Sequence, residues 1–232
     1  MEFVRIEPGS FWMGSPEDEF GREPQEVLHR VTLTRPFYIG RYEVTQEEWL
    51  RVMGRSPSHF DECGPRCPVD TISYLDIEVF IERLVRQGGE RLRLPTEAEW
   101  EYACRAGSED PFLTGVTLTT DDANFDGNPP YPGAPAGVNR GEPTPVGSFA
   151  ANAWGLHDMH GNTWEWVSDE HCAYSGDVTD PEGVCGGPLK VIRGGSFHYG
   201  PDSARCGLRY THRPQDDGFS LGFRLARDEV SP

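Results

Sequence analysis

The chain of 232 residues is long enough for one domain with a sizeable core. Asp and Glu outnumber Lys and Arg by 38 to 21, and the formal net charge of −17 disfavours nucleic acid and anionic membranes as partners, while it favours basic partners and divalent cations. No apolar run approaches the roughly 20 residues of a membrane helix, and the 27 glycines and 20 prolines predict much irregular backbone around an aromatic-rich core.

The N-terminal part of the chain predicts strands followed by one short helix. Residues 2–6 and 31–44 alternate apolar and polar side chains, as strands that pack on one face do. Thr45 can then cap a helix, because Glu48 follows at the position that completes a capping box.

A longer helix is predicted after Ser73, and Gly88 and Gly89 end it. Its apolar residues recur at helical spacing and predict a side that faces the core. These residues are Ile77, Phe80, Ile81, Leu84 and Val85.

A third helix is predicted from residues 94–96 to about Gly107. Thr96 and Glu99 form its capping box, and Pro95 suits its first turn. Its buried side is expected to carry Trp100, Ala103 and Cys104. A structural role is the main expectation for this helix.

Residues 106–146 are rich in Gly, Pro, Asp and Asn and predict a long loop, which a compact domain tolerates when something such as a bound cation holds it in place. Three short apolar runs bounded by turn-forming residues then predict strands at 190–192, 206–210 and 221–226. We therefore predict a single, loop-rich α+β domain over residues 1–232.

The six cysteines are compatible with two compartments. In an exported or periplasmic protein they would form three disulfides, and in the cytoplasm they would be reduced and mostly buried. We expect an exported or periplasmic protein, with a cytoplasmic location as the alternative.

The segment 158–165 is the strongest candidate for a metal site. Asp158 and Glu165 supply carboxylates, and the turn that contains Gly161 supplies backbone carbonyls. These are the hard oxygen ligands that calcium prefers. In the structural alternative both carboxylates only cap turns, and Trp164 fills the core.

The seven histidines raise a transition-metal alternative, because imidazole suits iron, copper or zinc. The candidates are His157, His160, His198 and His212. None of these histidines has a metal-site spacing with a carboxylate placed by a known motif, so we expect structural roles for them.

Six phrases occur in a fixed order, at 11–14 (FWMG), 42–45 (YEVT), 93–105 (RLPTEAEWEYACR), 161–166 (GNTWEW), 193–196 (RGGS) and 221–224 (LGFR). This series resembles the formylglycine-generating (sulfatase-modifying) enzyme family from about residue 3 to about residue 228. One phrase alone would carry little weight, whereas six in order over nearly the whole chain make a strong signal. The resemblance implies a C-type-lectin-like α+β fold with little regular secondary structure, as the residue patterns also indicate.

The resemblance also implies calcium. Active members hold one calcium ion at positions that match the side chains of Asp158 and Glu165 and the backbone oxygens of Gly161 and Thr163. They hold a second ion through an asparagine and the carbonyl that follows it.

The pair Asn124-Phe125 resembles that second set. In addition, Cys104 matches a family cysteine that pairs with the one in the Arg205-Cys206 phrase. The resemblance thus implies the first of three disulfides, and proximity gives the other two: Cys104–Cys206, Cys63–Cys67 and Cys172–Cys185.

The chain departs from the family at its catalytic residues. Active members carry two cysteines just after the Gly-Gly-Ser phrase; these bind monovalent copper and activate oxygen, which converts a substrate cysteine into formylglycine. Here the corresponding residues 197–204 contain no cysteine, and the segment from Ser196 to Cys206 is shorter. Because monovalent copper needs soft thiolates, we expect neither copper binding nor formylglycine formation.

Two hypotheses of function remain. In the first, the chain is a recognition domain that binds a peptide or a small-molecule ligand in a pocket lined by Trp164, Ser196, His198, Tyr199 and Arg209. In the second, it is an oxygen-dependent oxidoreductase with a histidine-bound metal in place of the cysteine-bound copper. We favour the recognition domain.

Overall fold

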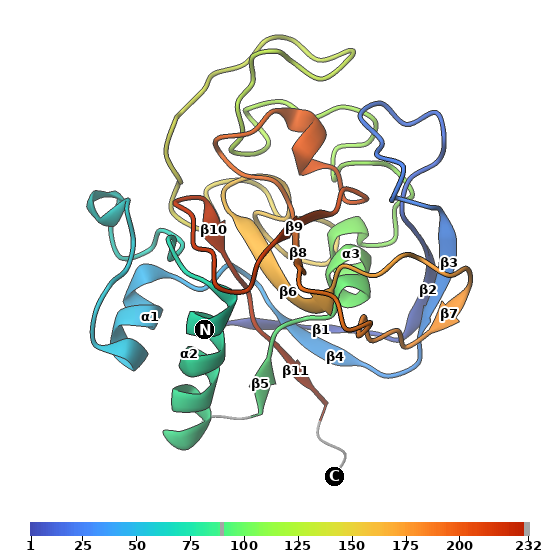
Figure 1. The fold of residues 1–232 in the computed structure, drawn as a ribbon. Coiled ribbons are helices and arrows are strands. Elements are labelled where there is room, and N and C mark those ends of the chain that lie inside the picture. Colours follow the sequence, from blue (N-terminus) through green and yellow to red (C-terminus); the bar gives the residue numbers. More distant parts are fainter. Residues whose placement is uncertain (89–90, 230–232) are drawn as a thin grey trace.

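Three small sheets form the framework of the fold (Figure 1). The computed structural model describes residues 1–88 and 91–229. The first sheet has the order β1-β4-β11-β5, with the bounds Phe3–Ile6 (β1), Phe37–Gly40 (β4), Ala226–Asp228 (β11) and Leu92–Arg93 (β5). Strands β1 and β11 both pair antiparallel with β4, so the first and last described strands lie in one sheet.

The second sheet holds the segments that the sequence analysis singled out. Its order is β10-β6-β8-β9, with the bounds Leu221–Gly222 (β10), Trp164–Glu170 (β6), Lys190–Arg193 (β8) and Tyr210–His212 (β9). The third sheet has the order β2-β3-β7, with the bounds Gly9–Met13 (β2), His29–Leu33 (β3) and Val178–Thr179 (β7). Two short 3₁₀ turns span Asp61–Cys63 and Pro201–Ala204.

The described residues contain three α-helices: α1 (Gln46–Met53), α2 (Tyr74–Arg86) and α3 (Glu97–Arg105). Each begins with a capping box, and the boxes predicted at Thr45 and Thr96 are confirmed. Helix α1 packs against α2, whereas α3 contacts β2, β6 and β8 in the middle of the molecule (Figure 1). Helix α2 ends before Gly88, and Gly89 lies outside the described residues.

Some strand bounds differ from the prediction. The predicted strand 31–44 is two strands, β3 and β4. The predicted strand 206–210 is a buried turn up to Arg209, because Cys206 N donates to Pro111 O and Leu208 N donates to Arg205 O. The predicted strand 221–226 divides between β10 and β11, which belong to different sheets.

The long loop is held in place by its own apolar cluster. The described residues 106–163 contain no helix and no strand longer than an isolated bridge. A cluster of buried residues nevertheless packs within the loop and against the 3₁₀ turn at 201–204: Phe112, Leu118, Ala123, Phe125, Tyr131 and Ala204. This apolar cluster helps to hold the loop in place, a role for which a bound cation was one expectation.

All six cysteines are paired, as Cys63–Cys67, Cys104–Cys206 and Cys172–Cys185. The predicted pairing is confirmed, and three disulfides are consistent with export. Within the described residues, none of the helices has the length and apolar character needed to cross a membrane.

Candidate functional site

Asp158 lies in a buried turn with a left-handed backbone conformation, at φ 56°. Its Oδ2 accepts a hydrogen bond from Gly147 N at 2.7 Å. Its Oδ1 is buried and has no hydrogen-bond partner, although buried carboxylate oxygens normally have one. Burial raises the pKa of this carboxyl group, and the hydrogen bond from Gly147 and the charge of Arg224 oppose the shift.

Glu165 has partners for both of its oxygens. Arg224 donates to Oε1 and Oε2 at 2.6 Å each, and Trp100 Nε1 donates to Oε2 at 2.7 Å. Both ion-pair partners are fully buried. Glu165 is therefore anchored by protein donors, and a cation at this carboxylate would share it with Arg224.

Glu43 is a third buried carboxylate, which the sequence analysis did not identify as a site residue. Its Oε1 accepts from Thr163 N at 3.1 Å and from Thr163 Oγ1 at 2.8 Å. Burial, and then the charges of Asp158 and Glu165, raise its pKa well above the ordinary value. A charged residue between the core positions Ile39 and Val44 was the available sequence signal.

The three carboxylates face one nearby arginine, Arg224, which their charges influence directly. When all are ionised, the cluster of Glu43, Asp158, Glu165 and Arg224 carries an excess of two negative charges. Uncompensated charge in a buried site is strongly unfavourable. A divalent cation beside the unpartnered Asp158 Oδ1 would offset this excess, so the residues fit calcium.

The second predicted calcium pair shows the same kind of unpartnered oxygen. Asn124 Nδ2 donates to Glu142 O at 3.0 Å and to Asn162 Oδ1 at 3.2 Å, which fixes the orientation of the amide. Asn124 Oδ1 then lies buried without a hydrogen-bond partner. Phe125 is buried in the loop cluster, and Asn124 forms a bridge with Gly161, so the two predicted sites adjoin.

Four of the five predicted ligand-binding residues lie together. Trp164 is buried, and its ring contacts Tyr199 (centroids 5.6 Å apart) and stacks on Tyr210 (5.9 Å). Ser196 Oγ accepts from His198 N at 3.4 Å. Tyr199 and Tyr210 are 43% and 52% exposed, so their rings cover the indole and face solvent.

Further aromatic residues that the sequence analysis missed extend this group. Phe219 lies 5.2 Å from His198 and 6.3 Å from Phe60 between ring centroids, and it is 42% exposed. An aromatic residue in a polar, turn-rich segment was the available signal for Phe60 and Phe219. We call the following residues, with Trp164 beneath them, the aromatic surface: Phe60, His198, Tyr199, Tyr210 and Phe219.

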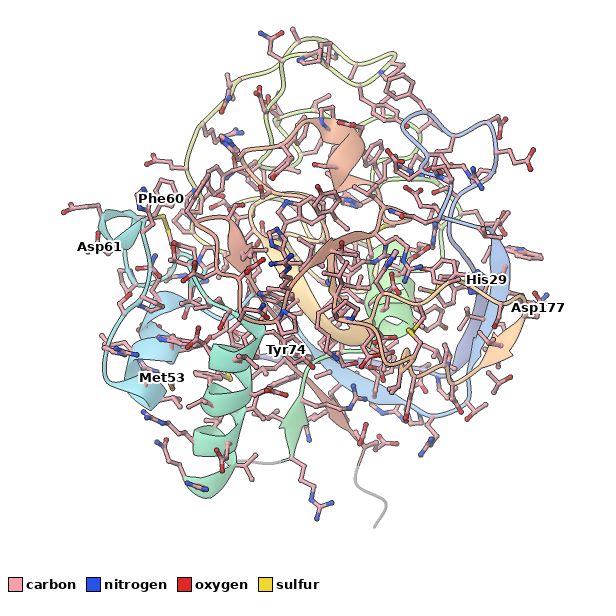
Figure 2. The ribbon with its side chains drawn as sticks, viewed as in Figure 1. His29, Met53, Phe60, Asp61, Tyr74 and Asp177 are labelled. Atoms are coloured by element: carbon pink, nitrogen blue, oxygen red, sulfur yellow. A yellow bond between two sulfur atoms is a disulfide. The ribbon has the colours of Figure 1, made fainter. Side chains whose placement is uncertain are left out.

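The side chain of Arg209 does not join the aromatic surface, although Arg209 directly precedes Tyr210. Its buried guanidinium makes two hydrogen bonds to Glu97, at 2.9 and 2.7 Å, and lies 4.1 Å from the ring centre of Tyr174. With His29 it lines a separate cavity of about 390 Å³. Phe60 and His29 lie on opposite sides of the molecule in Figure 2.

The histidines make local contacts. Leu113 N donates to His160 Nε2 at 3.0 Å, so Nδ1 carries the proton and donates to Ala204 O at 2.7 Å. Burial lowers the pKa of His160 to about 4. His157 Nδ1 lies 2.8 Å from Phe149 O. These bonds occupy both ring nitrogens of His160 and one of His157.

The described part of the chain brings three metal-capable ligand atoms together at two places: Cys104, His160 and Cys206, and Glu170, Cys172 and Cys185. Both groups contain cysteines that are joined in a disulfide. Neither group includes His157, His198 or His212.

Comparison with known proteins places this arrangement in a family. The model of the sulfatase-modifying factor enzyme 1-like domain matches residues 1–229. The formylglycine-generating enzyme of Bos taurus is 34% identical, over 99% of this chain and 75% of its own length. The serine/threonine-protein kinase pkn1 of Chlamydia caviae is 27% identical over 97% of this chain, which spans only 38% of that relative.

The structure of PvdO from Pseudomonas aeruginosa is also similar. It superimposes with a TM-score of 0.78 at 33% sequence identity, and the alignment covers 98% of this chain and 94% of PvdO. A family match over nearly the whole length, together with this agreement in fold, shows that the chain belongs to the formylglycine-generating enzyme (sulfatase-modifying factor) family and has its C-type-lectin-like fold.

Proposed function

We propose that the chain is a calcium-stabilised recognition domain that has the family fold without the copper chemistry. It binds a peptide or a small-molecule ligand at the aromatic surface. One observation carries this proposal: residues 197–204, which correspond to the segment with the two copper-binding cysteines of active members, instead display Tyr199 against the ring of Trp164 and His198 against Tyr199.

The state of the cysteines supports the loss of copper chemistry. All six are in disulfides, and none is free. A disulfide sulfur does not offer the thiolate that monovalent copper requires. The histidine-metal alternative gains no support from the described residues, because His160 uses both ring nitrogens in hydrogen bonds and neither group of three metal-capable ligand atoms includes His157, His198 or His212.

The two unpartnered oxygens support calcium. Asp158 Oδ1 and Asn124 Oδ1 belong to the two predicted sites, and both are buried without a hydrogen-bond partner. Calcium, when bound, would supply positive charge and coordination to these oxygens. A cation that binds only the folded chain would stabilise it by about 2.7 kcal/mol at 100 times its dissociation constant.

The charge of the chain indicates the kind of ligand. With a net charge of −17, the protein attracts positively charged partners. The exposed ring faces of Tyr199 and Tyr210 can hold Lys or Arg side chains by cation–π contacts, worth about 0.5–1 kcal/mol each at exposed sites. We therefore propose that the ligand is a basic peptide and that this chain is an exported domain that binds it.

A displayed library of random peptides, selected on the full chain in the presence of calcium, tests this function. Enriched peptides should carry Lys or Arg. Tyr210→Ala should weaken binding of an enriched peptide at least about fivefold, because truncating a central aromatic contact commonly removes more than about 1 kcal/mol.

Trp12→Ala is the matched control, since Trp12 is a similarly exposed aromatic residue (42%) on β2. It should leave peptide affinity unchanged. Enrichment of peptides without positive charge, or equal binding by the Tyr210→Ala and wild-type proteins, would contradict the proposed ligand site.

A further inference from the structure

We infer that calcium occupancy sets the geometry of the aromatic surface, and that Asn162 is the positioning residue that joins the two. This inference rests on the calcium sites proposed above. It predicts that the aromatic surface is ordered only when calcium occupies the two segments that carry its proposed ligands, which are 158–165 and Asn124-Phe125. We call these the calcium segments. Calcium and ligand would then strengthen each other's binding.

Both calcium segments are hydrogen-bonded to the strip of chain that displays the aromatic side chains. Asn162 O, in the first segment, accepts from Phe197 N at 2.9 Å. Asp126 N, next to the second pair, donates to Tyr199 O at 2.9 Å. Residues 197–199 are therefore held from two sides, once by each segment that carries proposed calcium ligands.

The indole beneath the surface is attached to the same segment. Trp164 directly follows Thr163, whose carbonyl is a proposed ligand, and its ring supports Tyr199 and Tyr210. A shift of the Thr163 backbone would therefore move the Trp164 indole beneath the aromatic surface as well as residues 197–199.

The Asn162 side chain links the two calcium segments to each other. Asn162 is fully buried in a left-handed conformation at φ 61°. Its Oδ1 accepts from Asn124 Nδ2 at 3.2 Å and from Thr144 N at 2.9 Å, and its Nδ2 donates to Glu43 Oε2 at 3.0 Å. The backbone adds a bond from Asn162 N to Asn124 O at 2.7 Å.

Glu43 also belongs to the network that links the two calcium segments. One of its oxygens holds the Asn162 amide, and the other holds both donors of Thr163. The orientation of the Gly161 and Thr163 carbonyls on either side of Asn162 thus depends on the same network that orients Asn124 Oδ1. Calcium at either site therefore favours the backbone arrangement that the other site and residues 197–199 require. Such coupling between sites is reciprocal.

Hydrogen exchange followed by mass spectrometry tests the inference without a known ligand. The full chain is compared in calcium and in a calcium chelator, with the peptide that contains the Phe197 and Tyr199 amides as the readout. We expect calcium to slow exchange of these amides at least about tenfold, within the range of typical coupling factors.

Asn162→Gly is the test variant, because glycine accepts φ 61° and retains the backbone bonds while it removes the side-chain links. It should bind calcium more weakly, as measured by calorimetry, and at a calcium concentration that saturates the variant it should show less than a threefold calcium effect at residues 197–199. Asn152→Ala removes another buried asparagine, which bonds Ala103 O and Leu156 N, and should keep the full calcium effect.

The outcomes separate the two proposals. Calcium binding to the wild-type chain with unchanged exchange at residues 197–199 would overturn the coupling and leave the calcium sites standing. Absence of calcium binding would overturn both. If Asn162→Gly does not fold, the wild-type comparison alone decides, because it needs no variant.

Discussion

At the scale of single residues, Gly161 shows how closely the two proposed calcium segments meet. It has φ 80°, and a Cβ added there would lie 2.2 Å from Asn124 O. Neither the backbone conformation nor the available space accepts a side chain. Replacing Gly161 by alanine should therefore disturb both segments.

Gly161→Ala tests this, with Gly54→Ala as its control. Gly54 has a similar φ of 78°, but no atom lies within 4 Å of the added Cβ. We expect Gly54→Ala to lower the free energy of unfolding by about 1 kcal/mol through backbone strain alone. Gly161→Ala should lower it by about 3 kcal/mol or more and should also remove the calcium-induced rise in Tm. Equal losses in the two variants, measured by urea denaturation, would contradict the close contact.

His160 gives a pH prediction with a definite sign. Its folded pKa of about 4 lies below the unfolded value of 6.5, so its stabilising effect is lost as pH falls from about 6.5 through 4. Asp169 acts in the opposite direction, because burial raises its folded pKa to about 6 and its protonated form favours folding below that pH. The comparison must therefore isolate His160.

His160→Gln removes only the histidine contribution. Between pH 7 and pH 5 the wild-type chain should lose about 2 kcal/mol more unfolding free energy than the variant. Urea titrations at both pH values measure this difference. The same pH dependence in both proteins would show that His160 is not buried in its neutral form.

The sequence predicted some residues of the candidate site and missed others for physical reasons. Asp158 was predicted because a carboxylate stands beside a glycine turn, and Asn124 was predicted from the family resemblance; both have an unpartnered buried oxygen. Glu43 was missed because its role depends on burial beside Asp158 and Glu165, which are distant in sequence. Phe219 was missed because no periodic pattern surrounds it.

At the scale of secondary-structure elements, local signals predicted helices better than strands. Capping boxes and helical spacing predicted α1, α2 and α3, since the interactions that define them lie within one turn. Strand β6 was not predicted, because both of its faces are largely buried and its side chains alternate in polarity only over its first three residues.

The disulfides differ in how much chain they restrain. Cys104 and Cys206 are separated by 102 residues, and Cys172 and Cys185 by 13. The chain-entropy model assigns about 4.7 kcal/mol to a loop of roughly 100 residues and about 3 kcal/mol to one of roughly 15. Replacing the first pair by alanine should therefore lower the free energy of unfolding by about 2 kcal/mol more than replacing the second. A larger loss from the second pair, in urea titrations under non-reducing conditions, would contradict this ranking.

At the scale of the whole molecule, the chain has the family fold, and we propose that it lacks the family's copper chemistry. We expect no conversion of a cysteine in a sulfatase-type peptide to formylglycine, even with copper and oxygen supplied, because all six cysteines are in disulfides. Mass spectrometry of the peptide, with a reaction lacking the protein as control, provides the measurement. Gain of an aldehyde above that control would mean that the chain retains an active copper site.

The most direct test of a calcium-stabilised recognition domain is the metal content of the protein purified without chelator. Elemental analysis by mass spectrometry should find calcium in stoichiometric amount and neither copper nor iron above trace levels. The unpartnered Asp158 Oδ1, the neighbouring carboxylates of Glu43 and Glu165, and the absence of free thiolates lead to this expectation. Stoichiometric copper or iron, or a chain free of calcium that melts at the same temperature with and without added calcium, would contradict the account.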